Sequence, residues 1–283
     1  MQGRTWEDAV RWLRSQPDQA ELVRDCYYDD PLLAAAQRFA ASDEWQALRA
    51  LLPASCGTAL DLGAGRGISS YALARDGWQV TALEPDPSPL VGVAAIRGLA
   101  KESDLPITIV QEAAEALPFA DRSFDLVYGR AVLHHARDLQ RLCREVARVL
   151  KPGGRLVATR EHVISRAADL PAFLAAHPLH RLYGGENAYL LAQYTAALRS
   201  SGLRPVSAFG PYDSAINYAP MTNDEWRASC ARHLARVLGA RAAAAFTNDQ
   251  SPFGRWLLAR LARLRSRLDS TPGRLYSFVA EAG

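Results

Sequence analysis

A glycine-rich stretch and two carboxylates stand close together in the first half of the chain. The stretch Asp61-Leu62-Gly63-Ala64-Gly65-Arg66-Gly67 follows an apolar segment and precedes a helical pattern. Glycines in such a turn let the backbone approach a ligand, and the N-terminus of the following helix favours anionic groups. We expect Asp61 to hold a ligand ammonium group and Glu84 to accept both hydroxyls of a ribose. A dinucleotide fingerprint needs a third glycine where this chain has Ile68, so the spacing disfavours NAD.

Ionisable residues gather further along the chain, at the end of another apolar segment. Arg160-Glu161-His162 follows a run that is typical of a buried strand. One interpretation is an ion pair that closes the strand. The other is a catalytic base or a clamp on a substrate, with His162 as the better base because its unperturbed pKa lies near neutrality.

Two more histidines and a glutamate, His177, His180 and Glu186, follow within a short distance. With His162 they suggest a metal site of the two-histidine, one-carboxylate kind. Pro178 leaves the ligand geometry open, so we predict no metal here and expect instead a loop over 162–186 that covers the substrate. In that loop His177 and His180 contact the substrate, and Gly184-Gly185 is the hinge.

Alternating strands and helices must position these residues. Apolar runs predict strands over 58–62, 78–83, 106–110, 124–128, 155–159, 204–209 and 274–280, and helices over 69–75, 88–99, 139–150 and 187–200. Strands separated by helices of this length indicate right-handed βαβ units and a parallel sheet. Helical patterns also fill residues 1–52 and most of 211–272. We therefore divide the chain into a helical cap (1–55), a core (56–210), a helical insertion (211–272) and a closing strand (273–283).

From about residue 57 to 161 the sequence resembles the class I S-adenosylmethionine-dependent methyltransferases. The resemblance rests on motifs in order: Leu60-Asp61-Leu62-Gly63-Ala64-Gly65-Arg66-Gly67, Leu83-Glu84-Pro85-Asp86, Ala114-Glu115-Ala116-Leu117-Pro118-Phe119, Ser123-Phe124-Asp125-Leu126-Val127 and Arg148-Val149-Leu150-Lys151-Pro152-Gly153-Gly154. It implies an α/β, Rossmann-like, doubly wound sheet of seven mostly parallel strands with an antiparallel last strand. It also implies S-adenosylmethionine as cofactor, bound by Asp61, Gly63, Ala64, Gly65, Glu84, Pro85, Ala113, Ala114 and Arg130.

One departure concerns the adenine contact. Similar family members carry an aspartate where this chain has Ala113, so backbone atoms of Ala113 and Ala114, or the side chain of Glu112, must take over that contact. By the same resemblance His134 lines the methyl-transfer pocket and His135 packs inside.

The resemblance implies transfer of a methyl group to a nucleophile but does not name the acceptor. We expect a small-molecule or sugar-like acceptor, methylated on oxygen rather than nitrogen or sulfur. The expected catalytic residues are His162, His134 and Glu161, and the expected substrate contacts add Tyr27 and Tyr212 to His177 and His180. Three alternatives stay open: a member of the fold that binds the sulfonium without methylating, a non-catalytic partner protein, and a metal-assisted enzyme that uses His162, His177, His180 and Glu186.

Composition and charge exclude some classes of protein and leave a question about the insertion. The chain has 283 residues, its N-terminus lacks the pattern of a signal peptide, and no apolar run suits a membrane span, so we expect a cytoplasmic protein. Its four scattered cysteines argue against a disulfide framework. The net charge of +3 divides into +8 between Arg227 and Arg274 and −5 elsewhere.

The basic segment contains two parallel stripes. Its leucines are Leu257, Leu261, Leu264 and Leu268, and its arginines are Arg260, Arg263 and Arg267. We expect the leucines to pack on the sheet and the arginines to face solvent. An arginine face turned toward the crevice would instead indicate an anionic acceptor. The sequence carries no nucleic-acid-binding motif, so we expect no nucleic-acid partner, and the oligomeric state stays open.

Overall fold

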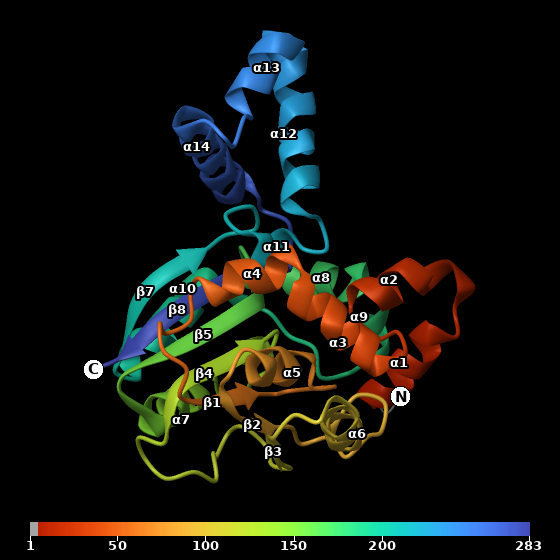
Figure 1. Cartoon of the computed structure of the whole chain (residues 1–283), viewed down its shortest axis with the longest axis vertical. Helices are drawn as coiled ribbons and strands as arrows, with labels where there is room; N and C mark the ends of the chain where they lie inside the picture. Colours follow the sequence, from red (N-terminus) through yellow and green to blue (C-terminus); the bar gives the residue numbers. More distant parts are fainter. Residues whose placement is uncertain (1–4) are drawn as a thin grey trace.

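A single mixed sheet forms the centre of the molecule. The computed structural model describes residues 5–283, and the strands lie in the order β3-β2-β1-β4-β5-β8-β7 (Figure 1). They are β1 (Thr58–Leu62), β2 (Gln79–Leu83), β3 (Ile107–Val110), β4 (Phe124–Arg130), β5 (Leu150–Ile164), β7 (Leu203–Phe209) and β8 (Arg274–Ala282). Strands β1 to β5 run parallel, whereas β8 lies antiparallel between β5 and β7. The predicted fold class is therefore confirmed. A short strand that the sequence did not predict, β6 (Tyr189–Leu190), pairs with the end of β5.

Helices cover both faces of this sheet, because alternate residues of each strand are buried on opposite sides. In β4, Val127 joins a cluster with α7 (Leu139–Val149) and α10 (Leu191–Ser200). Its neighbours Leu126 and Tyr128 join the opposite cluster, which contains residues of α5 (Ile68–Arg75). The remaining core helix, α6 (Val93–Ser103), begins five residues later than the expected start at Ser88.

Within the described residues, four α-helices precede the sheet, of which the last two join the second of these clusters and the first two pack in a separate cluster with Leu179. They are α1 (Trp6–Arg14), α2 (Ala20–Asp25), α3 (Leu32–Ala41) and α4 (Asp43–Arg49). Two buried arginines tie them to the core. Arg130, at the end of β4, forms an ion pair with the buried Glu44 at 2.8 Å. Arg66 donates hydrogen bonds to the carbonyl oxygens of Tyr27 and Asp29 at 2.9 and 3.0 Å.

The expected loop over 162–186 is largely regular structure. Strand β5 continues through His162 to Ile164, and α8 (Leu170–Ala176) and α9 (Pro178–Leu182) follow. Leu179 of α9 packs with residues of α1, and Tyr183 contacts Trp6 with ring centroids 5.0 Å apart. The segment is therefore a helical cover that meets the N-terminal helices over one edge of the sheet (Figure 1).

The insertion forms an arm that projects from the sheet (Figure 1). It contains α11 (Ala215–Tyr218), α12 (Asn223–Leu238), α13 (Ala240–Phe246) and α14 (Pro252–Leu268). The arginine stripe of α14 is exposed, as expected, and α14 lies in the projecting arm, so the charge does not indicate an anionic acceptor. The expectation that the leucine stripe packs on the sheet is wrong. Leu264 is 53% and Leu268 is 73% exposed, and the packed residues of α14, Leu258 and Ala262, contact Trp226 of α12. Across residues 5–283, no helix combines the length and apolar character needed to cross a membrane.

The ion pair between Glu44 and Arg130 yields a stability prediction. Glu44→Ala leaves the Arg130 guanidinium in a buried position without its carboxylate, which lowers the free energy of unfolding by about 3 kcal/mol. Urea denaturation of the purified protein measures this value. Glu102→Ala removes a carboxylate from the exposed face of α6 and is the matched control, with a change within about 0.5 kcal/mol. Equal losses in the two variants would contradict the anchoring role of Glu44.

Candidate active site

The turn between β1 and α5 is shaped for close approach of a ligand to the backbone. Gly63, Gly65 and Gly67 have φ angles of 63°, 55° and 83°, which other residues rarely adopt. A Cβ atom on Gly63 would lie 2.8 Å from Val132 Cγ2, whereas a Cβ on Gly65 would meet only the Val91 carbonyl oxygen, at 4.0 Å. No side chain caps the N-terminus of α5 at Gly67. The turn therefore offers open space beside Gly65, next to a helix N-terminus that no side chain caps, and such a terminus favours an anionic group.

Glu84 follows β2 directly and borders the same turn. Its carboxylate accepts hydrogen bonds from the backbone N–H groups of Gly65 at 2.8 Å and of Asp86 at 3.0 Å. Burial raises the pKa of Glu84 to about 7, although these two hydrogen bonds lower it. Each carboxylate oxygen has a further lone pair, so the group fits the expected role as acceptor for ribose hydroxyls.

Asp61 occupies a different environment from the one the sequence suggested. Its buried carboxylate accepts hydrogen bonds from the hydroxyls of Ser69 and Ser70 at 2.8 and 2.5 Å, and so fixes the first turn of α5 to β1. Burial raises its pKa to about 6 against the effect of these hydrogen bonds. The ammonium contact stays a prediction, while the observed contacts give Asp61 a positioning role.

The remaining residues expected at the cofactor lie in three places. Ala64 donates its backbone N–H to the Leu83 carbonyl oxygen at 3.0 Å, and Pro85 follows Glu84. Ala113 and Ala114 lie in the loop after β3, with Ala113 exposed. The Arg130 guanidinium is held by Glu44 and lies over the ring of Phe39, so its side chain supports the cap instead of facing a ligand.

A buried carboxylate joins β5 to the turn after β4. Glu161 Oε1 accepts the backbone N–H groups of Val132 and Leu133, each at 3.1 Å. Its Oε2 accepts the backbone N–H of His134 at 3.0 Å and contacts His134 Nδ1 at 2.7 Å. A shift in the pairing of β5 with β8 between Ala158 and Glu161 accompanies a left-handed φ of 58° at Arg160. This local bulge changes the direction of the side chains after Thr159.

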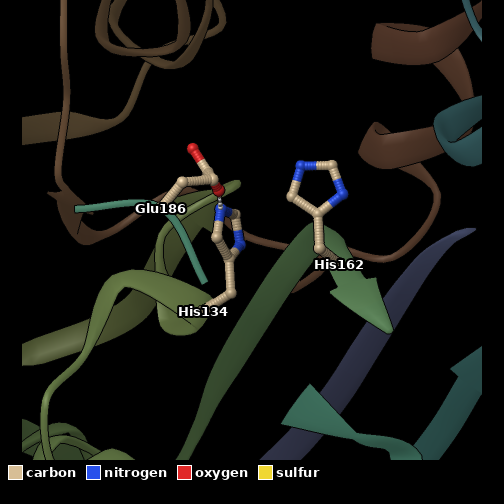
Figure 2. A group of neighbouring side chains, drawn as sticks. All are labelled: His134, His162 and Glu186. Carbon is tan, nitrogen blue, oxygen red and sulfur yellow. Dashed lines mark ion pairs between the residues drawn. The ribbon is translucent and has the colours of Figure 1, made fainter. Parts of the chain in front are cut away.

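His134 contacts a second carboxylate, and His162 lies beside it (Figure 2). His134 Nε2 is 3.1 Å from Glu186 Oε1, and the side chains of both residues are almost fully buried. The rings of His134 and His162 have centroids 4.6 Å apart, and His162 Nδ1 lies 2.9 Å from the Gly273 carbonyl oxygen. His180 Nε2 is 3.8 Å from Glu186 Oε2. We call His134, Glu161, His162, His180 and Glu186 the histidine–glutamate cluster.

Electrostatics divide the cluster into charged and neutral groups. Burial lowers the pKa of His134, but its contacts with Glu161 and Glu186 outweigh this effect and raise the pKa to about 9. Burial raises the pKa of Glu186, yet His134 brings it down to about 2. Burial and the charge on His134 hold the pKa of His162 well below its ordinary value. A positive His134 between two carboxylates therefore adjoins a neutral His162 at pH 7.

The other predicted substrate contacts are only partly brought together. His177 caps α9, since its Nδ1 accepts the Leu179 N–H at 3.2 Å, and it adjoins His180 with ring centroids 4.6 Å apart. Tyr27 is buried against Phe39 in the core. Tyr212 stacks on Trp226 at the base of the arm. The observed contacts of Tyr27 and Tyr212 do not include the cluster, so the prediction of a shared pocket is not supported for them.

The expectation that His135 packs inside is wrong, because His135 is exposed, whereas His134 is buried and its place in the methyl-transfer pocket stays a prediction. Trp6, in the expected helical cap, belongs to the cover. Its indole donates to the Tyr28 hydroxyl at 3.1 Å and its ring contacts Tyr183. Surface hollows of about 330 and 380 Å³ lie beside α1 and between α7 and α10, and neither is lined by the glycine turn or the cluster. The side chains of His134, Glu161 and Glu186 are almost fully buried, so the cover lies closed over the cluster.

Comparison with known proteins shows similarity to methyltransferases. Residues 60–158 match the family model of the methyltransferase domain. The chain is 33% identical over 193 residues to 27-O-demethylrifamycin SV methyltransferase of Amycolatopsis mediterranei (strain S699), covering 66% of this chain and 68% of the relative. It is 30% identical over 163 residues to the ubiquinone biosynthesis O-methyltransferase of Methylobacterium nodulans (strain LMG 21967 / CNCM I-2342 / ORS 2060), covering 56% and 64%. The matched region thus spans about two thirds of the length of each relative.

Two solved structures share the fold at low identity. Geranyl diphosphate C-methyltransferase from Streptomyces coelicolor A3(2), solved with S-adenosyl-L-homocysteine, superposes with a TM-score of 0.59 at 15% identity over 98% of both chains. The [4+2]-cyclase SpnF superposes with a TM-score of 0.55 at 21% identity, covering 88% of this chain and 81% of the cyclase.

The raised pKa of Glu84 yields a pH-dependent prediction. Above a pH of about 7 the carboxylate is ionised and accepts hydroxyl hydrogen bonds, and protonation at lower pH removes an acceptor. Affinity for S-adenosylhomocysteine should therefore fall by about tenfold between pH 8 and pH 6, as measured by calorimetry. Glu84→Gln should bind more weakly at pH 8, by about 2 kcal/mol, and lose this pH dependence. An equal pH dependence of the affinity in the unaltered protein and in Glu84→Gln would show that Glu84 is not part of the binding site.

Proposed function

Because this chain belongs to the class I S-adenosylmethionine-dependent methyltransferases, we propose that it transfers the methyl group to an oxygen atom of a small-molecule acceptor. The cofactor supplies an electrophilic methyl group on a sulfonium. The glycine turn and Glu84 fit this cofactor, because the turn offers uncapped N–H groups and open space beside Gly65, and Glu84 offers hydroxyl acceptors. The residues of the chain contribute binding, orientation and exclusion of water.

The histidine–glutamate cluster carries the oxygen part of the proposal. A hydroxyl acceptor must lose a proton when its oxygen is methylated, so an O-methyltransferase gains from a proton acceptor beside the methyl group. The turn that begins at Val132 connects the two regions, since Val132 Cγ2 lies against Gly63 and the Val132 N–H is held by Glu161. In this proposal Glu161 and the positive His134 orient the acceptor's oxygen, and the neutral His162 removes its proton.

The similar proteins support the same acceptor class. The names of both relatives place the methyl group on oxygen, in a rifamycin and in ubiquinone biosynthesis. The cover formed by α1, α8 and α9 belongs to the additions outside the matched region 60–158. In this proposal those additions select the acceptor, and His177 and His180 contact it from the cover.

A turnover assay tests the proposal directly. Purified protein is incubated with S-adenosylmethionine and a panel of phenols, catechols, hydroxylated macrocycles and sugars, alongside matched amines and thiols. We expect S-adenosylhomocysteine to form with hydroxyl acceptors and the methyl ether to appear by mass spectrometry. Methylation of only the amines or thiols would contradict the oxygen assignment. Binding without any methylated product across all classes would favour a non-methylating member of the fold.

Substitution of His134 tests the cluster's role separately. His134→Ala should lower kcat by about 10² to 10⁴ with a hydroxyl acceptor, because the residue that links both carboxylates is lost. Affinity for S-adenosylhomocysteine should stay within about threefold of the unaltered protein, which shows that the variant is folded. His233→Asn, on the exposed face of α12, is the matched control with unchanged kcat. An active His134→Ala enzyme would exclude the cluster from proton removal.

A further inference from the structure

We propose that His134, His162 and Glu186 form a binding site for one divalent transition-metal ion. One ligand atom of each residue lies within 4.8 Å of the others, and the three side chains converge from the turn after β4, from β5 and from the segment before β6 (Figure 2). Two imidazoles and a carboxylate form the donor set that suits zinc, iron, cobalt or manganese and leaves further coordination positions open.

Both histidines are held in the tautomer that a metal requires. His134 Nδ1 contacts Glu161 Oε2 at 2.7 Å, and His162 Nδ1 contacts the Gly273 carbonyl oxygen at 2.9 Å. Because Nδ1–H of each ring donates to a carboxylate or a carbonyl oxygen, the lone pair of the neutral ring lies on Nε2. Metal-bound histidines have this kind of support, in which the second nitrogen donates to a carboxylate or to a backbone oxygen.

Glu186 supplies a buried carboxylate oxygen that faces the imidazole of His134 without a well-formed hydrogen bond. Its side chain is 2% exposed, and Oε1 has no hydrogen-bond partner although it lies 3.1 Å from His134 Nε2. A buried carboxylate oxygen without a donor is costly unless a cation or another donor meets it. Figure 2 shows this carboxylate directed at the imidazole of His134.

The charges of the cluster also favour a bound cation. Within residues 5–283, the ion pairs of Glu161 and Glu186 reach only imidazoles. Even a fully protonated His134 leaves two carboxylates facing one positive charge. A divalent ion that replaces the proton on His134 Nε2 balances both carboxylates and also engages His162, which a proton on His134 repels.

Small side-chain movements complete the coordination. Metal–ligand bonds of about 2.1 Å place neighbouring ligand atoms roughly 3 to 3.5 Å apart, so the atoms must approach one another by about an ångström. His180 Nε2, 3.8 Å from Glu186 Oε2, is placed to follow Glu186 or to add a fourth ligand.

The role of the ion in catalysis rests on the proposed O-methyl transfer. An acceptor hydroxyl at an open coordination position would lose its proton more readily, because the metal stabilises the alkoxide or phenoxide. The oxygen then forms its bond to the methyl carbon while the carbon–sulfur bond breaks. The electron pair of the carbon–sulfur bond stays with sulfur. The proton leaves to a metal-bound hydroxide or to water.

Metal binding can be measured without an acceptor. The full chain is treated with a chelator, freed of the chelator, and titrated with Co²⁺ and Zn²⁺ by calorimetry and by the visible absorption of Co²⁺. We expect one ion per chain. Glu161→Gln should weaken binding by about 10 to 100-fold, since Glu161 supports His134, and His162→Ala or Glu186→Gln should weaken it further. His233→Asn removes an exposed histidine as the matched control and should leave the affinity unchanged.

The outcomes separate the metal site from the proposed function. Binding of S-adenosylhomocysteine checks that each variant is folded, and Glu186→Gln carries the test if Glu161→Gln fails to fold. Absence of a bound ion in the unaltered chain overturns the metal site and leaves a proton-sharing cluster. The same conclusion follows if His162→Ala and Glu186→Gln bind the ion as tightly as the unaltered chain does. A chain that binds one Co²⁺ but methylates nothing keeps the site and overturns the proposed function. Full methyl transfer by the metal-free chain overturns only the catalytic role.

Discussion

The carboxylate of Glu161 is the constraint on which the rest of the site depends. It is fully buried and accepts three consecutive backbone N–H groups, from Val132, Leu133 and His134. Without it, three buried donors would lack partners, each at a cost of about 1 to 3 kcal/mol. The same carboxylate orients His134, so the fold of the turn after β4 and the direction of its imidazole are determined together. The turn also sets Val132 against Gly63, which connects the cluster to the cofactor region.

A closed cover completes this arrangement from the other side. Glu186 reaches His134 only because α8 and α9 lie over the edge of the sheet, and α9 is held there by α1 through Leu179 and the contact between Trp6 and Tyr183. The cap is in turn tied to the core by Arg66 and Arg130. Since the cluster is buried, a substrate can enter only when this cover moves. We expect the contacts of α9 with α1 to open, because they join two additions to the fold rather than parts of the sheet.

Much of the fold could be predicted from sequence, because its signals are local. The apolar runs and the glycines that end them placed β1, β2, β4 and α7 within a few residues, and the ordered motifs identified the family. The bulge at Arg160 and the length of β5 could not be predicted, since they depend on pairing with β8, more than a hundred residues away.

For the site, the sequence predicted which residues take part but not which of them contact one another. His134, Glu161, His162 and Glu186 were all noticed, but only the fold decides that His134 is buried between two carboxylates while His135 is exposed. The contacts of Tyr212 with Trp226 and of Arg130 with Glu44 could not be predicted, because a position near the end of a strand does not determine what the side chain contacts.

The structure also distinguishes two features that could select the acceptor, the basic face of α14 and the residues of the cover. The basic segment carries most of the positive charge, yet Arg260, Arg263 and Arg267 lie on the exposed face of an arm that projects from the sheet (Figure 1). Charges on exposed surfaces are screened over about 10 Å at moderate ionic strength, so this face acts weakly on a ligand inside the closed cover. In the proposed function the acceptor instead meets the aromatic wall of the cover, where His162, Phe173 and His180 pack with ring centroids 4.7 to 5.3 Å apart. A flat or apolar acceptor that presents one hydroxyl to the cluster fits this wall better than a highly charged one, because burying an unpaired anion beside two carboxylates would be costly.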